Sequence, residues 1–183
     1  MKNLIPGILL LVSCASNATT INFDSMTPGL IATQTFDVGD YQFDFNGPFD
    51  PQSSPWAIGG VNNELSWADG QGSVGLEQGS DEIFGLTSID LGGWGPDIQL
   101  SVIGYLAGSG TVQLNYVSVI SGLETVSLGS QWSNLTRVEF TATGCCALVD
   151  NIIVSSVVPI PAAVWLFGSA LSGLGWLRRK QSA

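Results

Sequence analysis

Tryptophans in the middle of the chain are the side chains best suited to bind a sugar, because exposed indole faces stack on pyranose rings. Trp56 and Trp67 lie within residues 47–72, a stretch rich in glycine, proline, serine and asparagine that we predict to be a long loop. We therefore predict a carbohydrate-binding site at Trp56 and Trp67, with Trp94 in a glycine-rich turn as the next candidate. The alternative is that these indoles pack in the core, as large aromatic side chains commonly do.

Acidic side chains are the other groups that could catalyse a reaction or bind a cation. The chain has 15 of them and no histidine. The lack of histidine excludes Ser-His and Cys-His catalysis and most zinc sites. A carboxylate pair is sufficient for glycoside hydrolysis, but nothing in the spacing selects one, so we expect no enzyme activity. Glu77, Asp81 and Glu82 lie close together and fit either a second cation site or a solvated turn.

Cys145 and Cys146 are adjacent in the sequence and form a candidate disulfide if the chain is exported. A bond between neighbours requires a distorted peptide ring, so the pairing carries strain. Two free buried thiols and links to another chain are the alternatives that the sequence leaves open.

The charges are strongly segregated along the chain. All acids lie between Asp24 and Asp150, whereas Arg137 is the only basic residue inside that span. Residues 19–157 therefore carry a net charge of −14. Such a segment lacks the clustered lysine and arginine that nucleic acid requires, and anionic lipid headgroups repel it.

Short runs of alternating apolar and polar residues predict β-strands, and turn residues separate these runs. The candidate strands are residues 20–24, 41–45, 73–77, 82–91, 98–102, 112–116, 124–128, 135–141 and 147–154. We therefore predict an all-β domain over residues 19–156, an antiparallel β-sandwich or jelly roll. The domain is long enough to bury a two-layer core without needing disulfide bonds or metal ions for stability.

Residues 1–18 have the order of a signal peptide: Lys2, an apolar run, then small residues ending at Ala18. The apolar run is too short to span a bilayer. We predict cleavage after Ala18. The alternative is a lipoprotein signal, in which Cys14 becomes the lipidated first residue.

Residues 160–177 contain no charge and predict a C-terminal transmembrane helix, followed by Arg178, Arg179 and Lys180. Trp165 lies near one end of this helix, where aromatic rings prefer the membrane interface. The basic end should remain in the cytoplasm, which places the acidic domain across the inner membrane.

The same C-terminal segment resembles the PEP-CTERM sorting signal, in the variant that begins V-P-x-P-A-A-x-W-L-F-G-S. The matching residues are Val158, Pro159, Ile160, Pro161, Ala162, Ala163 and Trp165, with the basic end formed by Arg178, Arg179 and Lys180. Ile160 replaces the glutamate that gives the signal its name. The resemblance implies an exosortase-like membrane enzyme as partner, cleavage near Pro159–Pro161, and delivery to the cell surface or extracellular matrix of a Gram-negative bacterium that makes exopolysaccharide.

The last predicted strand, with Asp150 followed by Asn151, also resembles the ends of jelly-roll carbohydrate-binding modules. In such modules the first and last strands often lie together, and acidic and carbonyl oxygens hold a structural calcium ion. The resemblance therefore implies a candidate Ca²⁺ site at Asp24 and Asp150. Calcium prefers six to eight oxygen ligands, and the domain has many carboxylates.

Together these features predict an exported structural or adhesive protein of the cell surface or polysaccharide matrix. The first alternative is a carbohydrate-binding module that uses loop tryptophans, and the second is a weak carboxylate-dependent glycoside hydrolase. Exopolysaccharide is the expected partner outside the cell.

Overall fold

The computed structural model describes most of the acidic domain and little of the two ends. The described residues are 18–47, 56–59, 63–67, 72–79, 82–119, 121–144, 146–156 and 168–169. Contacts divide the chain into one unit of Asn17–Val157 and another of Met1–Ser16 with Val158–Ala183. The predicted signal peptide up to residue 17, Cys14, Cys145, the sorting motif 158–165 and the basic end 178–180 lie outside the described residues. Within the described part of the chain, no helix has the length and apolar character needed to cross a membrane.

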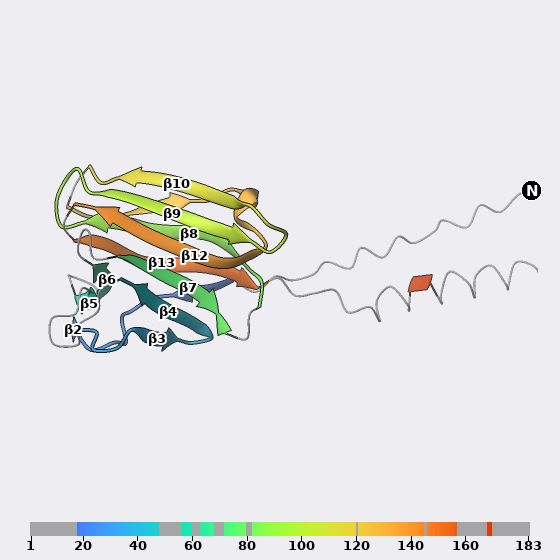
Figure 1. The fold of residues 1–183 in the computed structure, drawn as a ribbon, viewed down its shortest axis with the longest axis horizontal. Coiled ribbons are helices and arrows are strands. Elements are labelled where there is room, and N and C mark those ends of the chain that lie inside the picture. Colours follow the sequence, from blue (N-terminus) through green and yellow to red (C-terminus); the bar gives the residue numbers. More distant parts are fainter. Residues whose placement is uncertain are drawn as a thin grey trace, which may run out of the picture. The chain divides into compact units, whose positions relative to one another are not determined.

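The domain is all-β and antiparallel, with thirteen strands in one sheet that curls into two layers (Figure 1). The front layer has the strand order β3 (Thr35–Val38), β4 (Tyr41–Asn46), β7 (Ser73–Gln78), β12 (Leu135–Thr143), β9 (Gln99–Leu106) and β10 (Thr111–Val117). The predicted all-β antiparallel class is therefore confirmed.

The back layer is centred on the two longest strands. Its order is β2 (Gly29–Leu30), β5 (Trp56–Gly59), β6 (Glu64–Trp67), β13 (Ala147–Ser156), β8 (Phe84–Gly93) and β11 (Gly122–Ser127). The first strand, β1 (Ala18–Ile21), pairs with the last, β13. The two layers join where Leu135 of β12 pairs with Phe84 of β8, close to the short 3₁₀ helix η2 (Ser130–Trp132).

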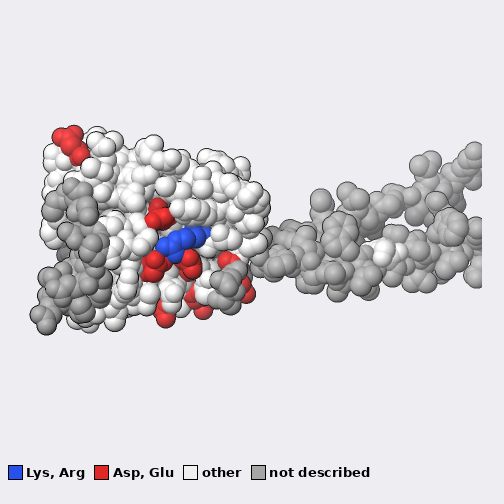
Figure 2. Space-filling view, viewed as in Figure 1, with Lys and Arg blue, Asp and Glu red and all other residues white. Residues whose placement is uncertain are grey.

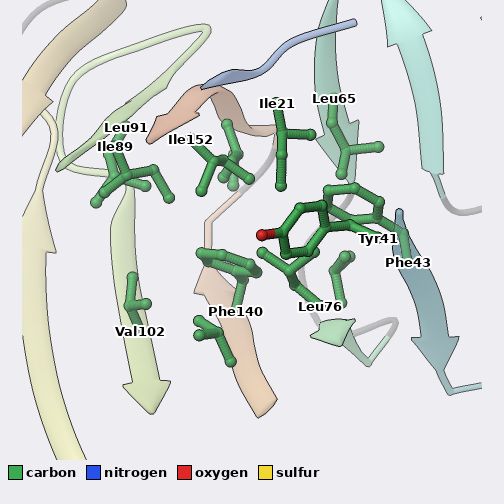
Figure 3. Close-up of a cluster of buried hydrophobic side chains, with 14 of the residues drawn as sticks. Ile21, Tyr41, Phe43, Leu65, Leu76, Ile89, Leu91, Val102, Phe140 and Ile152 are labelled. Atoms are coloured by element: carbon green, nitrogen blue, oxygen red, sulfur yellow. The ribbon is translucent and has the colours of Figure 1, made fainter. Parts of the chain in front are cut away.

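The core fills the space between the layers and is rich in aromatic and branched side chains (Figure 3). Alternation along β4 sends Tyr41, Phe43 and Phe45 into the core. Aromatic pairs bridge the layers: the rings of Phe45 and Trp56 are 5.5 Å apart, and those of Tyr41 and Phe84 are 5.8 Å apart. Packing of this core determines which face of each strand is turned toward solvent.

The region 47–72 differs from the predicted long loop, because it contains strands β5 and β6. All four residues of β6 are buried, so the strand has no apolar–polar alternation to reveal it. Strands β2 and β3 were not predicted either, since each has at most four residues.

Candidate functional site

The two tryptophans predicted to bind sugar belong to the core. Trp56 on β5 is 1% exposed and donates a hydrogen bond from Nε1 to the carbonyl of Thr33, at 3.1 Å. Trp67 on β6 is 2% exposed and packs against Phe140, with their ring centres 6.4 Å apart. Neither indole presents a face to solvent, so the prediction of a stacking platform at Trp56 and Trp67 is wrong. Trp94, the third candidate, is 58% exposed.

Asp24 and Asp150, the predicted calcium ligands, lie close together where β1 meets β13. Asp24 is exposed, whereas Asp150 is 2% exposed and its Oδ1 has no hydrogen-bond partner. Asp150 also stands directly opposite Asp90 of β8. Burial, aided by the charges of Asp24 and Asp90, raises the pKa of Asp150 to about 6, although the backbone N–H groups of Asn151 and Phe23 oppose this rise.

The described residues contain no group of three or more acidic or cysteine side chains arranged to hold a metal ion. Calcium takes six to eight oxygen ligands, of which Asp24 and Asp150 would supply the carboxylate oxygens. Calcium at this position stays a prediction.

Cys146 is disulfide-bonded. Its partner lies outside the described residues, since these include neither Cys145 nor Cys14.

The buried Asp150 predicts a distinctive pH dependence of stability. Because its pKa is raised in the folded state, the folded chain binds more protons than the unfolded chain between about pH 4 and pH 6. The contribution of this group to the free energy of unfolding should therefore fall as the pH rises through that interval, by at most about 3 kcal/mol. We expect Asp150→Asn to match the wild type near pH 4 and to exceed its stability at pH 7, as measured by urea unfolding.

The same variant, Asp150→Asn, tests whether calcium binds at Asp150. If a calcium ion binds at Asp150, then adding Ca²⁺ at pH 7 raises the Tm of the wild type and leaves that of Asp150→Asn unchanged. A wild-type Tm that is the same with calcium and with chelator counts against the site.

In the part of the chain that the structure describes, the outward side of the front layer carries many polar side chains that hydrogen-bond to each other. We call it the polar face, and it consists of the residues that alternate with the core residues on six strands. Its members are Thr35, Asp37, Gln42, Asp44, Asn46, Ser73, Gly75, Glu77, Ser101, Ile103, Tyr105, Gln113, Asn115, Arg137, Glu139 and Thr141.

Arg137 lies at the centre of the polar face, and it is the only lysine or arginine in the part of the domain that the structure describes (Figure 2). Its two terminal nitrogens donate to the two carboxylate oxygens of Asp44, at 2.7 and 2.8 Å. Nη1 also donates to Glu77. These hydrogen bonds, above all those to Asp44, raise the pKa of Arg137, so it is always charged. The positive charge of Arg137 is thus neutralised by the two carboxylates, so the arginine offers no net positive charge to an anionic ligand.

Gly75 allows this arrangement. It lies on β7, between Glu139 of β12 and Asp44 of β4 in the strand register. A Cβ atom at this position would collide with the guanidinium of Arg137 and with the carboxylate of Asp44. The arginine can therefore lie across β7 and reach β4 only because residue 75 has no side chain.

A second set of hydrogen bonds adjoins the first on β12. The Tyr105 hydroxyl donates to Oε2 of Glu139 at 2.8 Å, and the Ser73 hydroxyl donates to Oε1. The bond to Glu139 raises the pKa of Tyr105, so the phenol is neutral at physiological pH. Tyr105 is directly opposite Arg137 in the register, and it adds a partly exposed aromatic ring to the face.

The polar face continues into a hollow at the turn between β3 and β4. This hollow has a volume of about 380 Å³, and outward residues of the face, Asp37, Gln42 and Glu77, are among its lining. Gln42 donates a hydrogen bond to Asp37 at 3.2 Å. Carboxylate and amide groups held in this way suit ligands with many hydroxyl groups, which both donate and accept hydrogen bonds.

Sequence reasoning did not identify Arg137, Asp44 and Glu77 as a site. The alternation in residues 135–141 does place Arg137 and Glu139 on the face opposite Val138 and Phe140. However, Asp44 is 93 residues away from Arg137 along the chain. Only the strand order β4–β7–β12 brings them together.

Comparisons with known proteins show a likeness of fold alone. No protein-family model matches the chain, and no curated protein matches it. Among solved structures, a family 29 carbohydrate-binding module has 15% identity and a TM-score of 0.52, covering 78% of this chain and 90% of its own. A variant of such a module gives the same identity and TM-score, covering 78% and 87%. Another variant, solved with cellulohexaose, has 15% identity and a TM-score of 0.50, covering 76% and 91%. The domain thus shares its fold with carbohydrate-binding modules.

Proposed function

We propose that the domain binds a neutral polysaccharide on its polar face and that its role is binding, not catalysis. The observation that carries the proposal is the Arg137–Asp44 pair, which lies directly over Gly75 at the centre of a surface of carboxylates, amides and one tyrosine. Fixed planar polar groups lose little entropy when they bind hydroxyl groups. The likeness to carbohydrate-binding modules supports the proposal at the level of the fold.

The charge of the domain favours a neutral glycan over an acidic one. Arg137 is neutralised by Asp44 and Glu77, and Glu139 adds further negative charge beside them. With −14 charges over residues 19–157, an anionic polysaccharide is repelled unless divalent cations intervene.

The proposal is tested by calorimetric titration of the full chain with cellulohexaose, other neutral oligosaccharides and polygalacturonate. We expect binding to at least one neutral glycan and none to polygalacturonate without divalent cations. Gly75→Ala should reduce that affinity at least tenfold, because a methyl group displaces Arg137 from Asp44. Gly59→Ala on β5 is the matched control, since nothing lies within 4 Å of its added Cβ. Equal affinities for the two variants would contradict the assignment of the site.

We also propose that the chain reaches the polysaccharide matrix through its C-terminal sorting signal. The support is the resemblance of residues 158–169 and the basic end 178–180 to the PEP-CTERM signal. An exosortase-like enzyme would remove the segment after the domain, and the freed domain would be retained at the surface by the glycan it binds. The mass of the mature protein from its native cell tests this: a mass that still includes residues 165–180 contradicts processing.

A further inference from the structure

The exposed indole of Trp94 stands beside a second hollow, at the end of the domain where β8 leads to β9. This hollow has a volume of about 370 Å³ and a mainly apolar lining, which includes Trp94, Pro96, Ile98, Gly144 and Cys146. The carboxylate-bearing Asp97 also lines it and is exposed. An open aromatic face with one adjacent carboxylate is suited to a single sugar ring: the ring stacks on the indole and its hydroxyls donate to the acid.

The loop that carries Trp94 is held in place by hydrogen bonds on both sides. The Trp94 N–H donates to the carbonyl of Cys146 at 3.2 Å, and the Ser121 hydroxyl donates to the carbonyl of Trp94, also at 3.2 Å. Ser118 is buried. Its backbone carbonyl accepts a hydrogen bond from the Asp97 N–H at 2.8 Å, and its hydroxyl donates to the Gly95 carbonyl. The indole is therefore exposed on a fixed loop, and binding a ligand there costs little ordering entropy.

The hollow lies at one end of β9 and β12, which are two strands of the polar face. Ile98 directly precedes β9 and Gly144 directly follows β12, and the last register pair of these two strands is Gln99 with Thr143. From this end, β9 runs to Tyr105, opposite Arg137. At the usual rise of a strand, this distance is about 20 Å. A glycan that lies along β9 from the centre of the polar face therefore reaches Trp94 only if it has several rings.

We propose that the Trp94 hollow is a distal subsite for the same neutral polysaccharide, so that the domain selects long chains over short ones. The inference rests on the proposed function of the polar face. A protein partner is a weaker fit, because stable protein interfaces bury more than about 1,000 Å². Among the residues that the structure describes near this corner, the exposed large apolar side chains are those of Trp94, Val117 and Val119.

The test compares the affinities of wild type and Trp94→Ala for the neutral glycan that binds, using oligomers of two to six rings. In the wild type, affinity should rise at the length that reaches the hollow. In Trp94→Ala, this rise should disappear, with about a tenfold loss for the longest oligomer and no loss for the shortest. Because Trp94 is 58% exposed, the variant should keep the wild-type Tm.

The outcomes separate the two proposals. If the wild type binds glycans and Trp94→Ala retains full affinity for long oligomers, the distal subsite is overturned while the polar-face proposal stands. If the loss is equal at every length, Trp94 is not a distal subsite. If the wild type binds no glycan, both proposals fail. If Trp94→Ala abolishes self-association in sedimentation without changing glycan affinity, the hollow is a contact between copies of this chain, and the subsite is also overturned.

Discussion

Replacement of Arg137 by methionine is expected to abolish measurable glycan binding and to lower the free energy of unfolding by about 2 kcal/mol. Methionine keeps much of the length of the side chain but loses the hydrogen bonds to Asp44 and Glu77. These carboxylates, together with Glu139, would then face one another with no cation among them, and repulsion would move them out of the plane of the face. Calorimetric titration and urea unfolding measure the two effects separately.

Arg137→Lys is the matched control. Lysine retains the positive charge, so it should restore part of the lost stability. It cannot make the paired hydrogen bonds of the guanidinium to both oxygens of Asp44, so glycan affinity should stay at least tenfold below that of the wild type. If Arg137→Met binds glycans as the wild type does, the polar face is not the binding site.

Replacement of Trp56 by alanine is expected to lower the free energy of unfolding by about 4 kcal/mol, which is enough to unfold a marginal domain. Trp56 is 1% exposed and packs against both Phe36 and Phe45. Its removal leaves a cavity in the core, and the hydrogen bond to the carbonyl of Thr33 is lost as well. Thermal unfolding of the variant measures the change.

The Trp56→Phe variant distinguishes a core residue from a sugar-binding one. Phenylalanine fills part of the same space, so we expect a smaller loss of about 1–2 kcal/mol and a folded protein with wild-type glycan affinity. A Trp56→Phe protein that keeps its Tm and loses glycan binding would restore the original prediction for this residue.

The sequence predicts the strand framework well wherever a strand has one buried and one exposed face. The apolar–polar alternation of residues 41–45 and 135–141 corresponds to β4 and β12, whose burial alternates in the same way. The prediction misses β6, because all four of its residues are buried and its sequence shows no alternation. It also misses two-residue and four-residue strands such as β2 and β3, which are too short to show a period.

The candidate site is harder to predict than the fold for a physical reason. The Arg137–Asp44 pair depends on the order of non-consecutive strands, and the need for a glycine at position 75 follows from that order alone. Trp56 and Trp67 were misplaced because local composition indicates a loop, whereas tertiary packing encloses both indoles. Exposure of an aromatic residue is a property of the assembled layers, and the sequence around Trp94 reveals it only through its turn residues.

Amide chemical-shift mapping during titration with the neutral glycan that binds tests the central claim most directly. The account predicts that the largest shifts cluster on β4, β7, β12 and β9, around Asp44, Gly75 and Arg137, with little change on β13 and β8 of the back layer. Shifts confined to the back layer, or the absence of shifts with every neutral glycan, would contradict it.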